Sequence, residues 1–408
     1  MLPLIVFSWS LVFGADPAEA PRYAIRCSKI LTVDESNTVL NNAVLLVSSG
    51  RIEALGEQRS LGVPEGYTAI EVPTLWAAPG LIDFHDHIAG SLMDLNDGVY
   101  LSNPGLRALD TVEPDNDNLL KARAGGVTTV LLIPGSGNNI SGFGVFVKTA
   151  GDSIHEMLVR HPGSLKIAQS GNPERYWYGV ARSFMNWNTR DTLLRARAYH
   201  ESWRAYEDGR GEKPELNPYF HEFRGLFDKK FPTSVHTQIY QVVAETIQMQ
   251  HDELGLWVVT DHSEIGGFPL GRETARRGMF VVQGPRQLHF ERRDRKIYGD
   301  AGMWYALGEG KQKLGVNTDA PVIPQEELSY QATMAVHFGL PREYAMVAVT
   351  RLPAQAAGLY DRIGSLEVGK DADIGLWTGD PIDPQSACLM LLVNGRIAYD
   401  SKTMGRRF

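Results

Sequence analysis

Short apolar runs separated by turn residues occupy both ends of the chain. Toward the N-terminus such runs lie at 23–27, 30–33, 43–47, 52–54 and 68–72, with Asn-, Ser- and Gly-rich breaks between them. The C-terminal end repeats the pattern at 374–377, 390–393 and 396–399, the last two joined by an Asn394-Gly395 hairpin turn. Because each end alone is too small for a core, we expect 21–78 and 359–408 to form one composite β-sandwich domain.

Residues 79–358 alternate instead between short apolar stretches and longer helix-like ones, which indicates β-α units around a parallel sheet. Strands are expected at 126–133, 165–168, 234–236, 257–262, 279–282 and 314–319, and helices at 189–206 and 239–253. The long polar stretch at about 174–232 is expected to be a helical insertion. We find no repeat of fixed period in the sequence, which argues against a solenoid or a propeller.

The stretch 78–87, APGLIDFHDH, leads from a Pro-Gly turn through an apolar strand into His85-Asp86-His87. Side chains alternate along an extended strand, so His85 and His87 point the same way and can share one metal ion. Two nearby histidines can equally well end a strand with no ligand role, so the pair alone does not decide between these readings.

Three further residues of ligand type, His236, His262 and Asp319, stand at the C-terminal ends of later predicted strands. A barrel gathers these strand ends at one mouth, where the chemistry of such folds lies. Imidazole combined with carboxylate suits zinc-like ions. The five strand-end residues together therefore predict a metal site.

The composition limits the partners. A net charge of -8 without a dense Lys/Arg tract argues against a nucleic-acid partner and favours a small-molecule substrate. The chain's only cysteines, Cys27 and Cys388, form neither a metal motif nor a disulfide framework, and they can meet only if the two ends pack together. Whether they pair, and whether the chain forms a homo-oligomer, stays open.

Residues 2–15 form an almost uncharged apolar run followed by Ala18-Glu19-Ala20, which is typical of a secretory signal with a small-residue cleavage site. The run is too short for a comfortable membrane span. We therefore expect 1–20 to be a signal peptide and the protein to be exported to the periplasm or beyond. No Lys or Arg precedes the run, so a misplaced start codon and a cytoplasmic protein form the alternative.

Taken together, the motifs resemble the amidohydrolase superfamily of metal-dependent hydrolases. They are PGLIDFHDH, AGGVTTVLLIPGS at 124–136, VHT at 235–237, TDH at 260–262, NTDAP at 317–321 and RIGSLEVGKDADIGLWTGDP at 362–381. The stretches PGSGNNISGFGVFVK and LKIAQSGNPERYWYG resemble imidazolonepropionase-like members in particular. The resemblance covers nearly the whole chain after the leader. It implies an α/β fold, a distorted (β/α)8 TIM-like barrel over 79–358 beside a β-sandwich built from both chain ends.

The resemblance also implies a ligand set for one or two divalent metal ions, with zinc as the first choice. His85, His87 and Asp319 would hold the first ion. His236 and His262 would hold a second ion in a binuclear site, whereas a mononuclear site would use His236 and leave His262 near the substrate.

Related binuclear members bridge the two ions with a carboxylated lysine or with a Glu from a middle strand. Lys166 matches that position, and Lys148 is the alternative. A lysine beside a strand can also simply extend to water. Relatives tend to read Gly-Glu-Asn-Pro where this chain has Ser-Gly-Asn-Pro at 170–173, which leaves the number of ions open.

Such ligands predict hydrolysis of a non-peptide carbon–nitrogen bond, in a cyclic or linear amide or an amidine. The ions would lower the pKa of bound water and polarise the substrate carbonyl, so that a metal-bound hydroxide attacks it. Asp319 would act as general base and then general acid, and His262 would stabilise the oxyanion.

Arg175, Tyr178 and Arg182, just beyond a predicted strand end, could bind an anionic or aromatic substrate group, or could pack the insertion against the barrel. A dipeptidase or aminoacyl-amide hydrolase, and a deaminase, are alternatives on the same site. We see no clear Glu acid of the kind a deaminase uses. A non-catalytic binding protein would not need the five ligand-type residues.

Overall fold

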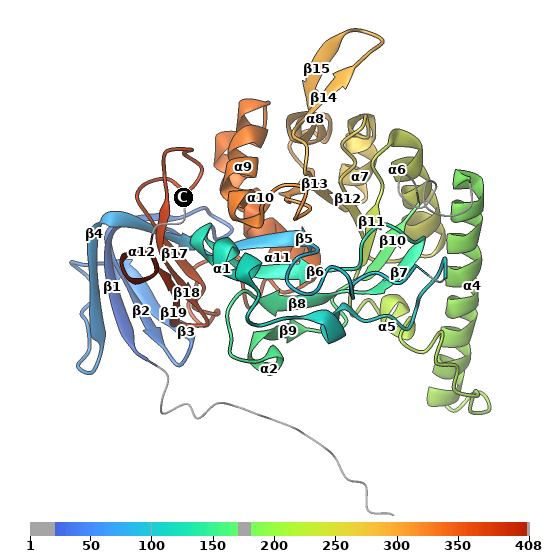
Figure 1. The fold of residues 1–408 in the computed structure, drawn as a ribbon, viewed down its shortest axis with the longest axis horizontal. Helices are drawn as coiled ribbons and strands as arrows, with labels where there is room; N and C mark the ends of the chain where they lie inside the picture. Colours follow the sequence, from blue (N-terminus) through green and yellow to red (C-terminus); the bar gives the residue numbers. More distant parts are fainter. Residues whose placement is uncertain (1–20, 99, 170–180, 406–408) are drawn as a thin grey trace, which may run out of the picture.

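A computed structural model describes residues 21–98, 100–169 and 181–405 (Figure 1). The chain has a TIM-barrel-like α/β fold, with a β-sheet packed at one end of it. The expected signal peptide at 1–20 lies outside the described residues, as do Arg175 and Tyr178.

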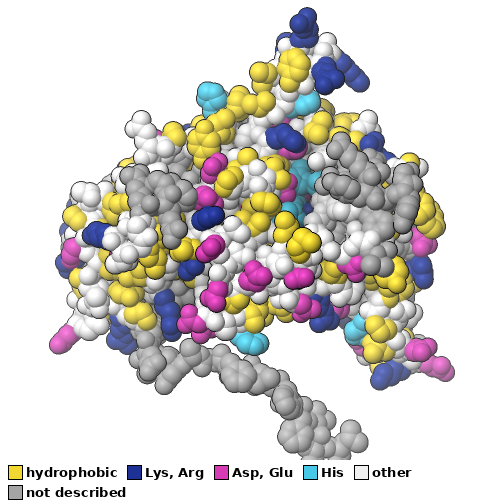
Figure 2. Space-filling view, in the orientation of Figure 1, with side chains coloured by type: hydrophobic (Ala, Val, Ile, Leu, Met, Phe, Trp, Pro, Cys, Tyr) yellow, Lys and Arg dark blue, Asp and Glu magenta, His cyan; other side chains and the backbone are white. Residues whose placement is uncertain are grey.

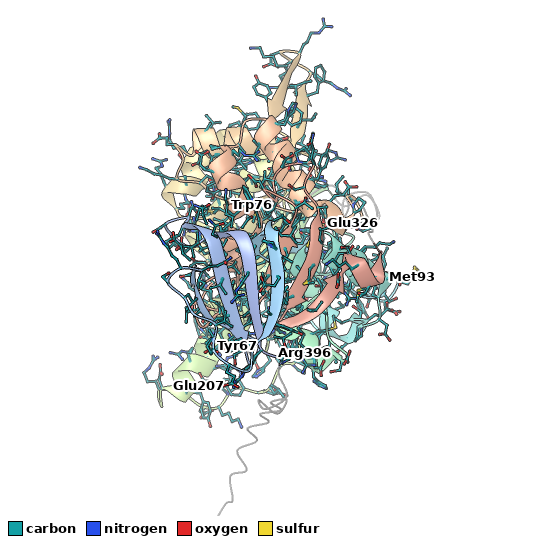
Figure 3. All side chains as sticks on the ribbon, turned by 90° about the vertical axis from the view of Figure 1, so that its left-hand side faces the viewer. Tyr67, Trp76, Met93, Glu207, Glu326 and Arg396 are labelled. Atoms are coloured by element: carbon teal, nitrogen blue, oxygen red, sulfur yellow. The ribbon has the colours of Figure 1, made fainter. Side chains whose placement is uncertain are left out.

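Both ends of the chain meet in one seven-stranded sheet, which lies at the left of Figure 1 and faces the viewer in Figure 3. Its order is β19 (Arg396–Asp400), β18 (Cys388–Val393), β17 (Ile374–Trp377), β4 (Thr68–Pro79), β1 (Tyr23–Leu31), β2 (Val39–Ser48) and β3 (Arg51–Glu57). β4 is parallel to β1 and antiparallel to β17, so it joins the two groups. The expected β-sandwich is not confirmed, because the ladder connects all seven strands in a single sheet.

The strand β1 replaces two strands expected at 23–27 and 30–33. Its register with β4 shifts between Cys27 and Lys29, so a β-bulge absorbs the polar residues without ending the strand. The Lys29 ammonium then lies 3.8 Å from the centre of the Trp76 ring on β4, which Figure 3 labels. The predicted hairpin is confirmed: Asn394 and Gly395 adopt φ values of 48° and 72° between β18 and β19.

The two cysteines lie in this sheet as free thiols. Cys27 is on β1 and Cys388 is on β18, and both are buried. Packing of the chain ends therefore brings them into one sheet without pairing them.

The central strands form two further sheets. One has the order β16 (Lys313–Val316), β13 (Phe280–Gln283), β12 (Val258–Asp261), β11 (Thr233–His236), β10 (Leu165–Ala168) and β7 (Ile140–Phe143), parallel except for β7. The other has the order β5 (Leu81–Asp86), β6 (Val127–Leu132), β8 (Val145–Lys148) and β9 (Leu158–Arg160). A parallel bridge from Asp86 to Ala320 places the two sheets side by side. Over the described residues the strands do not close into one continuous ladder.

Along β5, polar and apolar side chains alternate. Ile82 and Phe84 belong to a buried cluster with Ala354 of the helix α11 (Arg351–Ala357), while Asp83 and His85 take the other face. The face of β5 opposite to the helices therefore carries the polar groups toward its C-terminal end.

The helices surround these sheets (Figure 1). Those before β12 are α1 (Asp117–Ala124), α2 (Ile154–Met157), α4 (Arg182–Glu207), α5 (Arg224–Phe227) and α6 (Tyr240–Thr246). Those after it, besides α11, are α7 (Gly271–Arg276), α8 (Asp300–Leu307), α9 (Leu328–His337), α10 (Arg342–Val349) and α12 (Ser401–Met404). Short 3-10 turns are η1 (Ala108–Thr111), η3 (Phe268–Leu270) and η4 (Gln325–Glu327), and η2 (Ile247–Glu253) is a π-helix that continues α6.

The expected helix at 189–206 lies within α4, and that at 239–253 covers α6 and η2. α4 and α5 connect β10 to β11, the part of the chain where the insertion was expected. Within the described ranges, no helix combines the length and the apolar character needed to cross a bilayer.

A hairpin that the sequence analysis did not predict, β14 (Leu288–Glu291) and β15 (Lys296–Gly299), projects at the top of Figure 1. Tyr298 on one face packs against Phe268, with ring centres 5.4 Å apart. Phe290 and Ile297, paired across the other face, are exposed. The hairpin carries a basic tip at 292–296, seen at the top of Figure 2.

Candidate metal centre

Three of the predicted ligands converge at one point. His85 ends β5, His87 follows it, and Asp319 lies just beyond β16, with one ligand atom of each within 4.8 Å of the others. Asp319 Oδ1 is 3.3 Å from Nε2 of His85 and 3.3 Å from Nε2 of His87. The parallel bridge between the ends of β5 and β16 explains this meeting of residues more than 230 positions apart.

His236 and His262 complete the cluster from the ends of β11 and β12. The His262 ring centre lies 4.4 Å from that of His236 and 4.5 Å from that of His85. Nε2 of His236 and Nε2 of His262 are both buried without a hydrogen-bond partner. Such orphaned buried nitrogens carry a free-energy cost unless something else binds them.

Hydrogen bonds at Nδ1 fix how these rings face the cluster. His87 Nδ1 donates to the Ile133 carbonyl at 2.8 Å, and His262 Nδ1 donates to the Gly284 carbonyl at 2.6 Å. A carbonyl oxygen can only accept, so Nδ1 carries a proton, and Nε2 is the ring nitrogen left to face the cluster. His236 Nδ1 is held in the same way, 2.8 Å from the Ser136 hydroxyl.

Asp261, which the sequence analysis did not single out, lies beside the fourth ring of the cluster, that of His85. Its Oδ2 lies 3.2 Å from His85 Nδ1, without hydrogen-bond alignment, and also accepts a hydrogen bond from the Ser234 hydroxyl. Nothing in the spacing of Ser234 and Asp261 marks them as partners, because they come from two different strands.

Lys166 points from β10 into the same cluster. Its Nζ is fully buried and lies 3.0 Å from His85 Nε2. Burial lowers the pKa of Lys166 to about 8, although the charges of Asp261 and Asp319 act in the opposite direction. At pH 7 roughly one amine in ten is therefore neutral, and the neutral fraction grows as the pH rises toward 8.

Lys148, the alternative bridging residue, lies in a different environment. Its buried ammonium is 3.1 Å from Asp371 Oδ2 and also bonds to Asp373. These two carboxylates belong to the GKDAD stretch of the C-terminal segment. Lys148 thus ties the barrel to the terminal sheet, and Lys166 alone of the two lies beside the histidines.

The cluster favours neutral imidazole and an ionised carboxylate. Burial, together with Lys166 and neighbouring histidines, holds the pKa of His85 and that of His236 well below the ordinary value. Burial alone would raise the pKa of Asp319, but the nearby His262 and His87 rings outweigh it and lower that pKa. Both states are the ones in which these groups bind metal.

Two carboxyls next to the ligands fix the backbone around them. Asp83 bonds to Thr318, the neighbour of Asp319, and Asp86 accepts hydrogen bonds from the backbone of Ile88 and Ala89 and from Gln325. Burial raises the pKa of Asp83 to about 7 and that of Asp86 to about 6. The sequence reading treated Asp86 only as the middle of the HDH motif.

The donor set fits a divalent ion. Four imidazoles, one carboxylate and a lysine with a depressed pKa meet around two orphaned Nε2 atoms, a combination typical of zinc and related ions. Figure 2 shows histidine side chains inside a hollow of the molecular surface. Of the predicted substrate-binding residues, only Arg182 is described, as the first residue of α4.

A TIM-barrel-like fold carries these candidate metal ligands at its strand ends, where enzymes with such barrels have their active sites. A model of the amidohydrolase family matches residues 329–399. The imidazolonepropionase of Aromatoleum aromaticum is 28% identical over 388 residues, covering 88% of this chain and 91% of that protein. The crystal structure of an amidohydrolase from Thermotoga maritima is 25% identical with a TM-score of 0.82, covering 93% of this chain and 100% of that one.

Amidohydrolase tasK of Hapsidospora irregularis is 24% identical over 390 residues, which are 83% of this chain but only 38% of tasK. The chain thus spans well under half the length of that relative. Over most of its length the chain is thus similar to amidohydrolases, and it shares the fold of the Thermotoga maritima structure.

Proposed function

We propose that this protein hydrolyses a non-peptide carbon–nitrogen bond in a small molecule, a cyclic or linear amide or an amidine, at the cluster around His85. The observation that carries the proposal is the pair of buried, unpartnered Nε2 atoms on His236 and His262, next to Asp319 and the HDH histidines. These atoms have no other partner among the described residues, which fits a site built for metal.

His85, His87 and Asp319 would hold one divalent ion, and His236 and His262, with Lys166, a second. Zinc is the first candidate because of the imidazole-rich donor set. A bound ion would polarise the scissile carbonyl and make a water molecule acidic.

The chain's own residues then handle the proton. The lowered pKa of Asp319 keeps its carboxylate ionised at neutral pH, so Oδ1 can accept a proton from water and pass it to the leaving nitrogen. His262 donates through Nδ1 to Gly284, so Nε2 is the nitrogen that would offer a lone pair to a metal ion. That tautomer suits ligation, whereas oxyanion stabilisation would require a protonated ring.

Lys166 supports a carboxylated bridge. Its neutral amine can add carbon dioxide, forming an N–C bond and releasing a proton, and the pKa of about 8 makes that form accessible. Mass spectrometry of the intact chain, compared with a Lys166→Arg variant, tests for the added mass of one carbon dioxide.

The deciding experiment is Asp319→Asn, tested on a panel of cyclic amides, linear amides and amidines. We expect the wild type to turn over at least one member and the variant to lose that turnover while keeping the wild-type circular dichroism spectrum. Near-normal turnover by the variant would sink the proposed role of Asp319.

A dipeptidase or aminoacyl-amide hydrolase is the second candidate, and dipeptides belong in the same panel. A deaminase fits less well, because Glu264, two residues after His262, is already paired with Arg286. Release of ammonia from an amino-substituted ring, without amide cleavage, would favour the deaminase.

We also propose export through a signal peptide at 1–20, on the apolar run of that segment. N-terminal sequencing of the protein recovered from the culture medium or periplasm should begin after residue 20. Recovery of the unprocessed chain from the cytoplasm would favour a misplaced start codon.

A further inference from the structure

A buried glutamate and an exposed arginine form an ion pair on the loops that follow β12 and β13. Glu264 Oε1 accepts a hydrogen bond from Arg286 Nη1 at 2.5 Å, and Glu264 Oε2 accepts one from the Arg286 backbone N–H at 3.0 Å. One carboxylate therefore fixes both the backbone and the side chain of the arginine.

The pair lies next to the metal centre. Glu264 is two residues after His262, and Arg286 is two residues after Gly284, whose carbonyl binds His262 Nδ1 at 2.6 Å. The loops that hold the His262 ring thus also hold the Glu264–Arg286 pair. Figure 2 shows Lys or Arg atoms on the rim of the hollow that contains the histidines, on the side of the projecting hairpin.

The two partners differ sharply in exposure. The Glu264 side chain is 1% exposed, whereas that of Arg286 is 63% exposed. Only Nη1 of the guanidinium takes part in the side-chain hydrogen bonds found over the described part of the chain, and most of the side chain is open to solvent. A surface ion pair formed for solubility would not need a buried carboxylate as its anchor.

A second buried carboxyl, Asp300 at the start of α8, lies close enough to Glu264 for their charges to interact. Burial and the charge of Glu264 raise the pKa of Asp300 to about 8, so it keeps its proton at neutral pH. Arg286 is the cation that pairs with Glu264 beside this buried acid.

We propose that Arg286, held by Glu264, is a specificity residue that binds a carboxylate on the substrate, at the end away from the scissile carbon–nitrogen bond. A guanidinium with free, preoriented N–H groups matches a planar carboxylate. The substrate class is therefore amides that carry a carboxylate, and this inference rests on the proposed hydrolase function for its place in the reaction.

Matched probes test it. 5-Oxoproline and N-acetylalanine are a cyclic and a linear amide with a carboxylate, and their carboxamides differ only in lacking that charge. Binding to zinc-loaded full-length protein is measured by calorimetry, separately from turnover. We expect at least one carboxylate probe to bind more tightly than its carboxamide to the wild type, and Arg286→Gln to reduce that advantage about 10- to 100-fold.

Arg286→Gln leaves Glu264 buried without its cation and can unfold the loop. The double variant Glu264→Gln with Arg286→Gln removes both charges and keeps hydrogen-bonding groups at both positions, so it serves as the second variant. It should also lose the preference for carboxylate. The matched control is Arg272→Gln on α7, which removes an exposed ion pair with Glu309. It should keep the preference for carboxylate.

The outcomes separate this inference from the proposed function. An Arg286-dependent carboxylate preference without any turnover supports the anion site and contradicts the hydrolase. Three results would contradict the anion site. The wild type could show no preference for the carboxylate probes, or the double variant could keep that preference. Arg286→Gln could also lower the turnover of charged and neutral probes equally.

Discussion

Asp83 on β5 accepts a hydrogen bond from the hydroxyl of Thr318, which lies just after β16. The Thr318 amide also lies 3.4 Å from the second oxygen of the same carboxyl. This contact joins the first and last strands of the barrel-like region beside the cluster. It holds Asp319 within 3.3 Å of the two histidines that follow Asp83.

Thr318→Val should impair the site more than the fold. The substitution keeps the shape of the side chain but removes the donor to Asp83, so the loop that carries Asp319 loses its anchor. We expect activity or metal affinity to fall about 10- to 100-fold, as for other residues that orient metal ligands. Thr149→Val, which removes a buried hydroxyl bonded to Val127, is the control, and an equal loss there would refute the positioning role.

Removal of metal should lower both activity and stability. An ion that binds only the folded state at 100 times its dissociation constant stabilises it by about 2.7 kcal/mol. Chelation should therefore lower the melting temperature, and added zinc should restore it. The variant His87→Asn with Asp319→Asn should lose the part of this response that comes from the first ion. A zinc-induced rise as large as that of the wild type would place this ion elsewhere.

The two buried lysines should differ when each is replaced by Met. Lys148→Met leaves Asp373 buried without its cation, whereas Asp371 keeps Arg51 and Arg362, and the free energy of unfolding should fall by about 3–5 kcal/mol. Lys166→Met removes an amine whose burial already opposes its charge, so the metal-free protein should lose far less stability. Urea unfolding of the chelated proteins measures both, and equal losses would contradict the different roles of the two lysines.

Asp300 should make stability depend on pH. Its pKa is raised from 3.8 to about 8 in the folded state, so the stabilisation is complete below about pH 4 and is lost as the pH rises through about 8. Within that window the free energy of unfolding should fall by up to about 1.4 kcal/mol per pH unit from this group.

Asp300→Asn should flatten that dependence, measured by urea unfolding at several pH values. Asp361→Asn, at an exposed position, should leave it unchanged. The same slope in Asp300→Asn and in the wild type would show that Asp300 does not keep its proton in the folded state.

The convergence of the candidate ligands could be predicted because parallel strands bring their C-terminal ends together. His85, His236 and His262 each stand at or just after a strand whose apolar pattern is visible in the sequence. The residues that position these side chains could not be recognised from the sequence in this way. Asp261 and Asp83 act through hydrogen bonds between strands far apart in sequence, and neither periodicity nor spacing records such contacts.

The same limit applies to the larger structure. The short strands were found, yet the single sheet of the chain ends was expected as a sandwich, because a strand's apolar pattern does not say which neighbour it pairs with. The sequence allowed Lys148 as a bridging ligand. Its contact with Asp373, 225 positions away, shows instead that it pairs with the C-terminal segment.

The terminal sheet has a consequence for synthesis. β4 ends at Pro79 and its partner β17 begins at Ile374, so the nascent chain must present β4 with one open edge while the intervening residues are made. At about 5–20 residues per second this takes roughly 15–60 seconds on the ribosome. Throughout that time the exposed backbone of β4 can pair with other chains, so chaperones that shield strand edges should matter most for this protein before its last strands emerge.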